Sequence, residues 1–200
     1  MPEATVPATR STHVVLVGLM GSGKTTVGKK VAKLIGHRFI DGDVELEART
    51  GRTVADWFEE GEPAFRAKEA ELLAYLLADP DPLVIGAGGG VVVTESTRDR
   101  LREHDVTVVY LHGTPTFLAS RVQPKAHRPL LGDDPLAVLE PMYAERDPWY
   151  RSVADATVEV LPAHAAGEKP KWRLAEQVVD ELVALGVVDP AVVTAPEEVG

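Results

Sequence analysis

The sequence predicts a single α/β domain, a three-layer sandwich in which helices cover both faces of a parallel sheet. Short runs of apolar, β-branched residues alternate along the chain with longer segments in which apolar residues recur at helical spacing. No internal repeat interrupts this alternation. With 200 residues, 44% of them hydrophobic, the chain is long enough to bury one sizeable core.

The first strand and the first helix have the clearest boundaries. Residues 13–17, His-Val-Val-Leu-Val, form an apolar run that Gly18 ends. Apolar residues then recur at helical spacing over residues 24–35, and Gly36 follows them as a helix stop. A strand followed directly by a helix is the first half of a βα unit, which a parallel sheet requires.

The rest of the chain repeats this alternation. Further strands are predicted at residues 38–40, 83–87, 106–111 and 156–160. Further helices are predicted at residues 44–50, 53–60, 63–78, 95–104, 115–122, 135–147 and 171–185. Residues 161–170, rich in Pro, Ala and Gly, are expected to form a loop. We therefore expect one folded domain over residues 13–185, a flexible tail at 1–12 and a disordered tail at 186–200.

Composition and charge argue against several classes of protein. The net charge of −10 leaves no excess of Lys and Arg to neutralise phosphates, so general nucleic-acid binding is not expected. The chain has no cysteine, which excludes disulfides, thiolate metal sites and a cysteine nucleophile. No apolar run approaches membrane-spanning length, and residues 1–13 lack the features of a signal peptide. We expect a soluble, cytoplasmic protein without a membrane partner.

A phosphate-binding loop follows the first strand. Residues 18–25, Gly-Leu-Met-Gly-Ser-Gly-Lys-Thr, match the P-loop pattern at every fixed position, between an apolar strand and an amphipathic helix. The glycines allow backbone N–H groups to surround a phosphate at the helix N-terminus. Lys24 is expected to reach the β- and γ-phosphates, and Thr25 to place its hydroxyl beside Mg²⁺. An incidental Gly-rich turn is the less favoured alternative, so the loop predicts an ATP-dependent phosphotransferase.

Two aspartates end the second strand. Asp41 and Asp43 are two residues apart, so on an extended segment their carboxylates point the same way, toward the carboxyl edge of the sheet. One of them is a candidate Mg²⁺ ligand through water, and the other a candidate base for a substrate hydroxyl. The alternative is an Asp-Gly turn in which Asp43 caps the next helix.

Two further segments contain candidate ligands for an anionic acceptor. Arg66 and Glu69 are three residues apart on a predicted helix, so they can pair and fix the direction of the guanidinium. The alternative is a surface ion pair of little consequence. The run Gly88–Gly90 directly follows the strand at 83–87, which indicates a backbone that a ligand approaches closely. The alternative for this run is a flexible turn.

Two basic segments follow predicted helices. Residues 121–131 form a basic segment that prolines interrupt, with Arg121, Lys125 and Arg128. This pattern suits a lid closing over a triphosphate or, alternatively, a solvated loop. Arg151 is either a clamp for an anion or a cation favoured by the dipole of a helix end.

Taken in order, these segments resemble the shikimate kinase family. The family pattern combines a P-loop, Asp-x-Asp, Gly-Glu-x-x-Phe-Arg-x-x-Glu, Gly-Gly-Gly, an Arg-Pro-Leu lid and Tyr-Arg. It recurs here as Gly18–Thr25, Asp41 with Asp43, Gly61–Glu69, Gly88–Gly90, Arg128–Leu130 and Tyr150–Arg151. The P-loop alone is shared by many families, but its combination with Phe-Arg-x-x-Glu and Gly-Gly-Gly is specific, and the likeness spans residues 13–185.

The resemblance implies a fold, a reaction and a set of site residues. The fold would be that of P-loop nucleoside-monophosphate kinases, with a five-stranded parallel sheet in the order 2-3-1-4-5. The reaction would be MgATP-dependent phosphorylation of the 3-hydroxyl of shikimate in aromatic amino-acid biosynthesis. Apart from the resemblance, we expect the protein to be a monomer. A substrate region at about 41–70 and a lid at about 121–134 would enclose the site. The implied catalytic residues are Lys24, Asp43 and Arg128.

The binding residues implied by motif and resemblance fall into three groups. ATP would be bound by Gly21, Ser22, Gly23, Lys24, Thr25, Thr26, Arg121 and Arg128. Shikimate would be bound by Asp43, Arg66, Gly88, Gly89, Gly90 and Arg151. Mg²⁺ would be held by Thr25 and, through water, by Asp41.

Two other readings of the sequence stay open at this point. The first is another small-molecule P-loop kinase, such as gluconate kinase or a nucleoside monophosphate kinase, which would leave Phe65-Arg66 and the triple glycine unexplained. The second is a nucleotide-binding module without turnover, and the intact site residues argue against it: Lys24, Thr25, Asp43, Arg66 and Arg151.

Overall fold

Five parallel strands form one sheet in the order β2-β3-β1-β4-β5 in the computed structural model, which describes residues 12–122, 134–165 and 169–195. This order confirms the one that the resemblance implies. The strand bounds are β1 His13–Val17, β2 Arg38–Asp41, β3 Leu83–Gly86, β4 Val106–His112 and β5 Ala156–Glu159.

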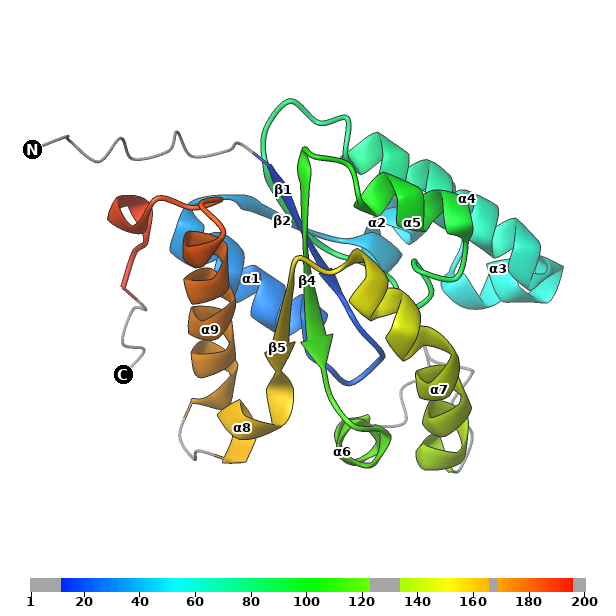
Figure 1. Ribbon diagram of the computed structural model, residues 1–200. Coiled ribbons are helices and arrows are strands. Elements are labelled where there is room, and N and C mark those ends of the chain that lie inside the picture. Colours follow the sequence, from blue (N-terminus) through cyan, green and yellow to red (C-terminus); the bar gives the residue numbers. More distant parts are fainter. Residues whose placement is uncertain (1–11, 123–133, 166–168, 196–200) are drawn as a thin grey trace, which may run out of the picture.

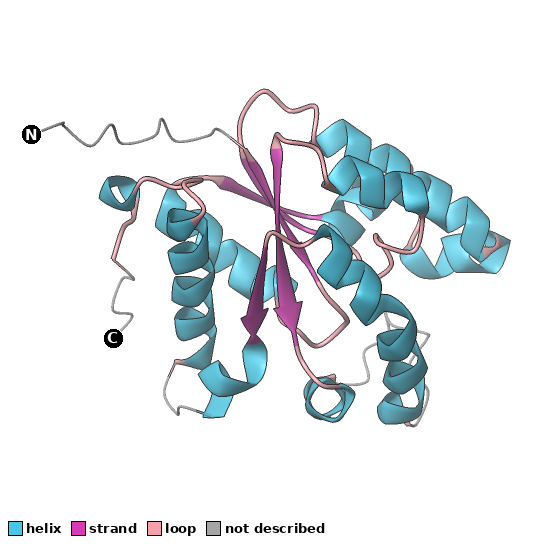
Figure 2. Ribbon diagram, in the orientation of Figure 1, coloured by secondary structure: helices cyan, strands magenta, loops and turns pink. Residues whose placement is uncertain are grey.

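Helices cover both faces of this sheet and complete the predicted three-layer sandwich. In Figure 1, α1 and α9 lie side by side on one face, while α4, α5 and α7 lie on the other; Figure 2 shows the strands between them. In the described residues the helices are α1 Lys24–Ile35, α2 Gly42–Thr50, α3 Val54–Glu60, α4 Glu62–Leu76, α5 Glu95–Leu101, α6 Pro115–Arg121, α7 Pro135–Val153, α8 Val160–Ala165 and α9 Pro170–Ala184. None of these helices is long and apolar enough to cross a membrane.

Burial explains why the central strands are continuous apolar runs. Every residue of β1, β3 and β4 is buried, because helices pack on both faces of the middle of the sheet. The edge strands β2 and β5 are partly exposed and carry polar residues among their apolar ones. The core thus runs through the centre of the sheet and continues into both helical layers.

The strand register brings three candidate segments to one edge. Leu16 of β1 pairs with Gly86 of β3, and Gly86 pairs with Asp41 of β2. The carboxyl ends of these parallel strands are therefore level with one another. Consequently the P-loop after β1, the aspartates after β2 and the glycine run after β3 all emerge at the same edge of the sheet.

Most predicted boundaries lie within a few residues of the observed ones, but two segments differ more. The helix predicted to end at residue 147 continues as α7 to Val153, although Pro148 lies inside it. A proline disfavours the helical conformation of the residue before it, but the burial of Tyr150 and Val153 in the core outweighs this preference. The predicted loop at 161–170 contains α8, whose Val160 and Ala163 are also buried.

The segment after α9 contains ordered structure where the sequence indicated disorder. Residues Pro190–Val192 form a 3₁₀ turn, and Asp189 caps it by accepting a hydrogen bond from the Ala191 N–H. The backbone N–H of Thr194 donates to the carbonyl of Leu34 at the end of α1 (2.9 Å). Contacts of Thr194 with α1 therefore hold this segment against the domain.

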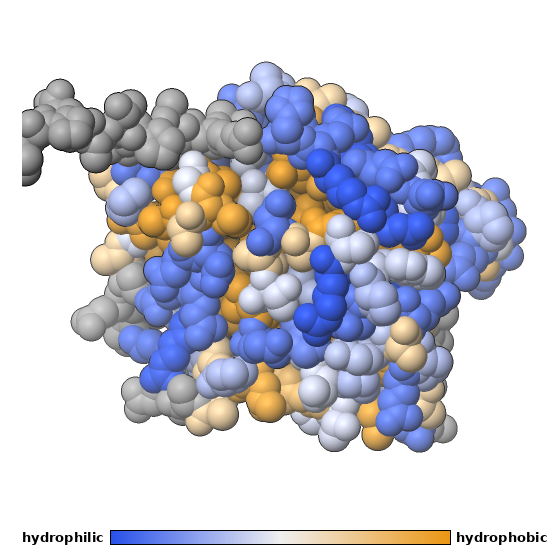
Figure 3. Space-filling model, in the orientation of Figure 1, coloured by the Kyte–Doolittle hydropathy of each residue, from blue (hydrophilic) through white to orange (hydrophobic). Residues whose placement is uncertain are grey.

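Polar side chains cover most of the molecular face shown in Figure 3, and apolar groups appear between them in separate patches. The large apolar side chains that are most exposed in the described residues lie on different elements: Val44, Tyr75, Leu161, Leu185 and Val192.

Candidate active site

A cleft of about 570 Å³ opens at the carboxyl edge of the sheet. Its walls come from the P-loop, the ends of β2 and β3, the α3–α4 region, the end of α6 and the middle of α7. The predicted residues that line it include Lys24, Thr25, Thr26, Asp41, Asp43, Arg66, Gly88, Gly89, Gly90 and Arg121. The fold therefore brings both halves of the predicted site into one cavity.

The P-loop glycines have backbone conformations that other residues rarely adopt. The φ angles of Gly21 and Gly23 are 86° and 100°, in the left-handed region. A Cβ atom on Gly21 would also lie 2.8 Å from the carbonyl oxygen of Leu118. Glycine is thus required here both for the turn and for the close contact with α6. Ser22, between them, is fully buried and is not among the residues that line the cleft.

Lys24 and Thr25 lie at the start of α1, where the P-loop ends. The Lys24 ammonium donates to the carbonyl oxygens of Gly18 (2.7 Å) and Leu19 (3.2 Å), which holds it over the loop. The Thr25 hydroxyl donates to Asp41 Oδ2 at 2.6 Å. The two candidate magnesium-binding side chains, from α1 and β2, are therefore in direct contact.

The two aspartates have separate structural roles. Asp41, not Asp43, is the N-cap of α2, since its Oδ1 accepts from the Val44 N–H at 3.4 Å. Asp43 lies in the first turn of α2, lines the cleft and faces the glycine run. A Cβ on Gly88 would be 3.0 Å from Asp43 Oδ1 and 2.5 Å from Glu69 Oε1, so glycine at 88 allows both carboxylates to approach the backbone.

Arg66 and Glu69 form a buried ion pair rather than the surface pair that was the alternative reading. Arg66 Nη1 donates to Glu69 Oε2 at 2.8 Å, and their side chains are only 10% and 11% exposed. Arg66 also donates to Glu62 Oε1 through Nη2 (2.8 Å) and Nε (3.1 Å). The guanidinium is thereby fixed against Gly90, where a Cβ would overlap it.

Burial and the neighbouring charges shift the pKa values of Arg66 and Glu69 in opposite directions. Burial lowers the pKa of Arg66, but the carboxylates of Glu69 and Glu62 outweigh it and the pKa is raised. Burial raises the pKa of Glu69, and Arg66 opposes this only in part. Arg66 therefore keeps its charge, while the pKa of Glu69 stays above its ordinary value in spite of the nearby guanidinium.

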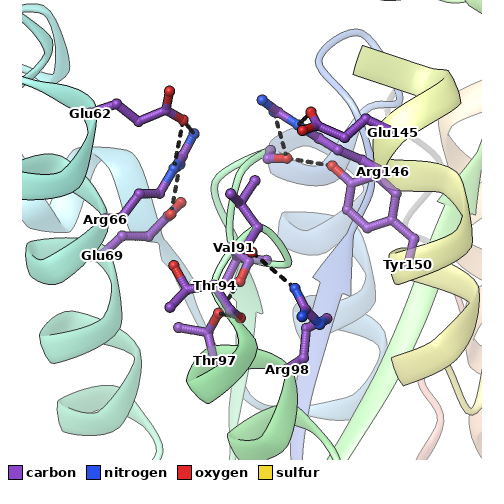
Figure 4. Close-up of polar contacts among 12 residues, drawn as sticks. Glu62, Arg66, Glu69, Val91, Thr94, Thr97, Arg98, Glu145, Arg146 and Tyr150 are labelled. Carbon is purple, nitrogen blue, oxygen red and sulfur yellow. Dashed lines mark hydrogen bonds and ion pairs between the residues drawn. The ribbon is translucent and has the colours of Figure 1, made fainter. Parts of the chain in front are cut away.

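Arg146 is a residue of the cleft that the sequence prediction missed. It lines the cavity from α7, and its Nη1 donates to the carbonyl oxygen of Gly89 at 3.3 Å. The Tyr150 hydroxyl, one helical turn further on, donates to the same oxygen. Figure 4 shows Arg146 and Tyr150 pointing from α7 toward the backbone around Gly89, on the side opposite Arg66.

The prediction that Arg151 binds the acceptor does not fit the structure. Arg151 Nε is paired with Asp147 Oδ2 at 2.8 Å, its side chain is 47% exposed, and it is absent from the residues that line the cleft. It lies in the last turn of α7, which matches the alternative reading of a cation at a helix end. Residues 146 and 151 are about 140° apart around a helix, so their side chains leave α7 on different sides.

Arg121 is the described part of the predicted lid. It ends α6, lines the cleft and donates from Nε to the carbonyl oxygen of Gly21 at 2.9 Å. Burial lowers its pKa. Arg128 and most of the predicted lid at 121–134 lie outside the described residues.

The cleft offers different chemistry at its two sides. The P-loop side has backbone N–H groups at a helix N-terminus and the ammonium of Lys24, which suit a phosphate. It also has the Thr25 hydroxyl hydrogen-bonded to the Asp41 carboxylate, which suits a hard cation. On the other side are two guanidinium groups, Arg66 and Arg146, next to the glycine run Gly88–Gly90. This set suits a small carboxylate. Asp43 provides a carboxylate in the same cavity. This arrangement is that of a small-molecule kinase.

Comparisons with known proteins agree with this geometry. A sequence model of the family described as shikimate kinase matches residues 20–184. The shikimate kinase of Chromobacterium violaceum is 47% identical over 167 residues, which cover 82% of this chain and 89% of that protein. The shikimate kinase of Thiobacillus denitrificans is 44% identical over 157 residues, covering 78% and 85%.

Solved structures give the same result. A shikimate kinase from Acinetobacter baumannii, solved in complex with shikimate, superposes with a TM-score of 0.78 at 35% identity, covering 87% of this chain and 94% of that one. The enzyme from Aquifex aeolicus superposes with a TM-score of 0.71 at 30% identity, covering 88% and 99%. These relatives are ATP-dependent kinases of the P-loop fold. The chain therefore belongs to the shikimate kinase family.

Proposed function

We propose that this protein transfers the γ-phosphate of ATP to the 3-hydroxyl of shikimate, a step of aromatic amino-acid biosynthesis. The observation that carries the proposal is the pair of guanidinium groups, Arg66 and Arg146, that line one cleft together with a P-loop. Two forked cations beside a glycine-rich backbone suit a small carboxylate, which shikimate has. The relative from Acinetobacter baumannii was solved with shikimate bound.

ATP would bind at the P-loop side of the cleft. The backbone N–H groups of Gly21, Ser22 and Gly23 would surround its β-phosphate, with Lys24 and Thr26 beside them. Arg121 and, from outside the described residues, Arg128 would add positive charge over the nucleotide. The binding of Arg121 to the P-loop carbonyl of Gly21 supports its place in this group.

Magnesium fits the contact between Thr25 and Asp41. Both side chains offer oxygen atoms, which Mg²⁺ prefers, and both line the cleft. Thr25 would hold the ion directly and Asp41 through water. The ion would neutralise charge on the phosphates.

The acceptor would lie on the side of the cleft that contains the glycine run Gly88–Gly90. Arg66, Arg146 and the backbone of Gly88–Gly90 would hold its carboxylate, and Arg146 takes the place first given to Arg151. Asp43 would contact the ring hydroxyls and accept a proton from the one that attacks. Phosphoryl transfer depends mainly on positioning and on neutralising charge, so Lys24 and the arginines would lower the barrier more than Asp43 does.

A coupled assay of ADP release with a panel of acceptors tests the proposal. Shikimate, gluconate and nucleoside monophosphates would each be supplied with MgATP, and we expect turnover with shikimate alone. Turnover with gluconate or a nucleotide in place of shikimate would overturn it. ATP binding without turnover on any of these acceptors would favour the reading of a non-catalytic module.

The setting in which the enzyme works is also part of the proposal. We expect it to act as a monomer in the cytoplasm, on small molecules and without nucleic-acid or membrane partners. The net charge of −10 and the scattered exposed apolar residues support this expectation.

A further inference from the structure

The backbone from Gly88 to Val93, which we name the glycine loop, is held from outside the cleft by side chains of α5 and α7. Thr97 Oγ1 donates to the carbonyl oxygen of Val91. Arg98 Nη1 donates to the carbonyls of Val92 (2.7 Å) and Val93 (2.9 Å). Figure 4 shows Thr97 and Arg98 reaching the loop from α5 while Tyr150 reaches it from α7.

Tyr150 is the most deeply buried of these side chains. It is 0% exposed, and its hydroxyl donates to the carbonyl oxygen of Gly89. Burial raises the pKa of this hydroxyl. The hydroxyl therefore stays protonated and remains a donor.

The geometry of a peptide bond transmits this contact to the cleft. In a trans peptide the C=O of one residue and the N–H of the next point in opposite directions. When Tyr150 holds the C=O of Gly89, it therefore turns the N–H of Gly90 away from α7. Among the described residues, no group accepts a hydrogen bond from the N–H of Gly89 or Gly90, and both glycines line the cleft.

The hydrogen bond from Tyr150 to Gly89 also affects the position of the Arg146 guanidinium. A carbonyl oxygen has two lone pairs, and that of Gly89 receives the Tyr150 hydroxyl and Arg146 Nη1 (3.3 Å). If the Tyr150 hydroxyl is removed, Arg146 Nη1 is the remaining side-chain donor to this oxygen among the described residues. The guanidinium would then move toward the glycine loop. The tyrosine thus supports both the loop and the cation.

We propose that Tyr150 is a positioning residue for acceptor binding: its hydroxyl fixes the Gly89–Gly90 peptide and Arg146 in the arrangement that receives the acceptor carboxylate. The acceptor part of this inference rests on the proposed function. Thr97 and Arg98 hold the rest of the glycine loop in the same way, so the acceptor meets a backbone that is already in place.

Tyr150→Phe tests the inference because it removes only the hydroxyl. We expect the KM for shikimate to rise about 5- to 20-fold, the effect of one or more weakened hydrogen bonds, with little change in the KM for ATP. Tyr110→Phe is the matched control. Tyr110 is 1% exposed and stacks on Tyr150 with ring centroids 4.9 Å apart, but its hydroxyl donates to Asp147 (2.9 Å), away from the loop.

Three kinetic results would overturn the inference. One is an unchanged KM for shikimate in Tyr150→Phe, another is an equal rise in both KM values, and the third is the same rise in Tyr110→Phe. If Tyr150→Phe does not fold, Thr97→Val examines the loop from α5, and there we expect a rise of about 3- to 10-fold in the KM for shikimate alone.

A second readout does not depend on the acceptor. Hydrogen exchange at the amides of residues 88–93 should speed up in Tyr150→Phe and stay unchanged in Tyr110→Phe. Equal exchange in both variants would contradict the positioning role. If the unmodified protein does not phosphorylate shikimate, the proposed function fails, and this exchange experiment still decides whether Tyr150 positions the loop.

Discussion

At the scale of single residues, the two arginines of the α7 segment differ in what their surroundings allow. Arg146 is held against the carbonyl of Gly89 and lines the cleft. Arg151 is half exposed and paired with Asp147. Exposed ion pairs contribute little, whereas a guanidinium that meets a carboxylate inside a cavity forms strong charge-assisted hydrogen bonds.

Replacing each of these arginines separately should give opposite results. Arg146→Ala should weaken acceptor binding by roughly 1.5–3 kcal/mol for each charge-assisted hydrogen bond lost, which is about a 10- to 150-fold rise in the KM for shikimate. Arg151→Ala should change this KM less than about twofold. Steady-state kinetics with shikimate as the varied substrate measures both. A large effect at Arg151 with none at Arg146 would restore the assignment made from sequence.

Glu69 is the second residue whose burial has a measurable consequence. Because burial raises its pKa above the ordinary value of 4.5, the folded protein binds this proton more tightly than the unfolded chain does. The contribution of Glu69 to stability is therefore fully present below about pH 4.5. It is lost as the pH rises through the raised pKa of the folded state.

Comparison with Glu69→Gln should reveal this pH dependence. The free energy of unfolding of the unmodified protein, minus that of Glu69→Gln, should fall as the pH rises above about 4.5, by about 1.4 kcal/mol for each unit of the shift. Urea unfolding at a series of pH values measures this difference. Glu71→Gln, an exposed position on the same helix, should show little such trend. A difference that grows with pH would mean that Arg66 lowers the pKa of Glu69 below 4.5.

At the scale of elements, α1 illustrates how a local pattern and a tertiary contact combine. Its apolar spacing and its glycine stop predicted residues 24–35, and the helix has those bounds. The sequence pattern does not explain Gly28, since glycine lowers the stability of a helix interior. In the structure Gly28 is buried where α1 crosses β2, and a Cβ there would overlap the Phe39 ring.

Gly28→Ala should therefore destabilise the protein although alanine favours helices. We expect the free energy of unfolding to fall by about 1–3 kcal/mol, because overpacking outweighs the roughly 1 kcal/mol gained in helix propensity. Thermal or urea unfolding measures this. Lys29→Ala, an exposed position on the same helix, should stay within about 0.5 kcal/mol of the unmodified protein. A more stable Gly28→Ala would show that Phe39 moves aside without cost.

At the scale of the whole molecule, the exposed apolar residues and the net charge affect whether copies of the chain associate. The exposed large apolar residues described above lie on separate elements, and the net charge of −10 makes copies repel one another. Both features favour a monomer, because a stable dimer needs a large complementary patch.

Sedimentation velocity should accordingly give one species with the mass of a single chain. We expect this at micromolar concentration, both in about 0.15 M salt and at higher ionic strength, at which charge repulsion is screened. A species of twice that mass at higher salt would show that charge alone keeps the copies apart. Such a species in both conditions would contradict the expectation of a monomer.

Most of the fold was predictable because its signals are local. Buried parallel strands are continuous apolar runs, and their order agrees with the family that the motifs indicate. The prediction failed where a distant contact outweighs a local preference. The burial of Tyr150 and Val153 carries α7 past Pro148, and a hydrogen bond from Thr194 to Leu34 orders a segment whose composition indicates disorder.

The sequence by itself determined the phosphate-binding side of this protein. Eight consecutive residues, 18–25, specify the P-loop, because a glycine turn at a helix N-terminus needs only its own backbone and its neighbours. Only the tertiary structure decided the acceptor side. Arg66 and Glu69 are buried because other elements cover them, and Arg146 rather than Arg151 enters the cleft because α7 continues and fixes which face it turns toward the glycine loop. Those side chains come from separate elements, so their meeting depends on how the elements pack.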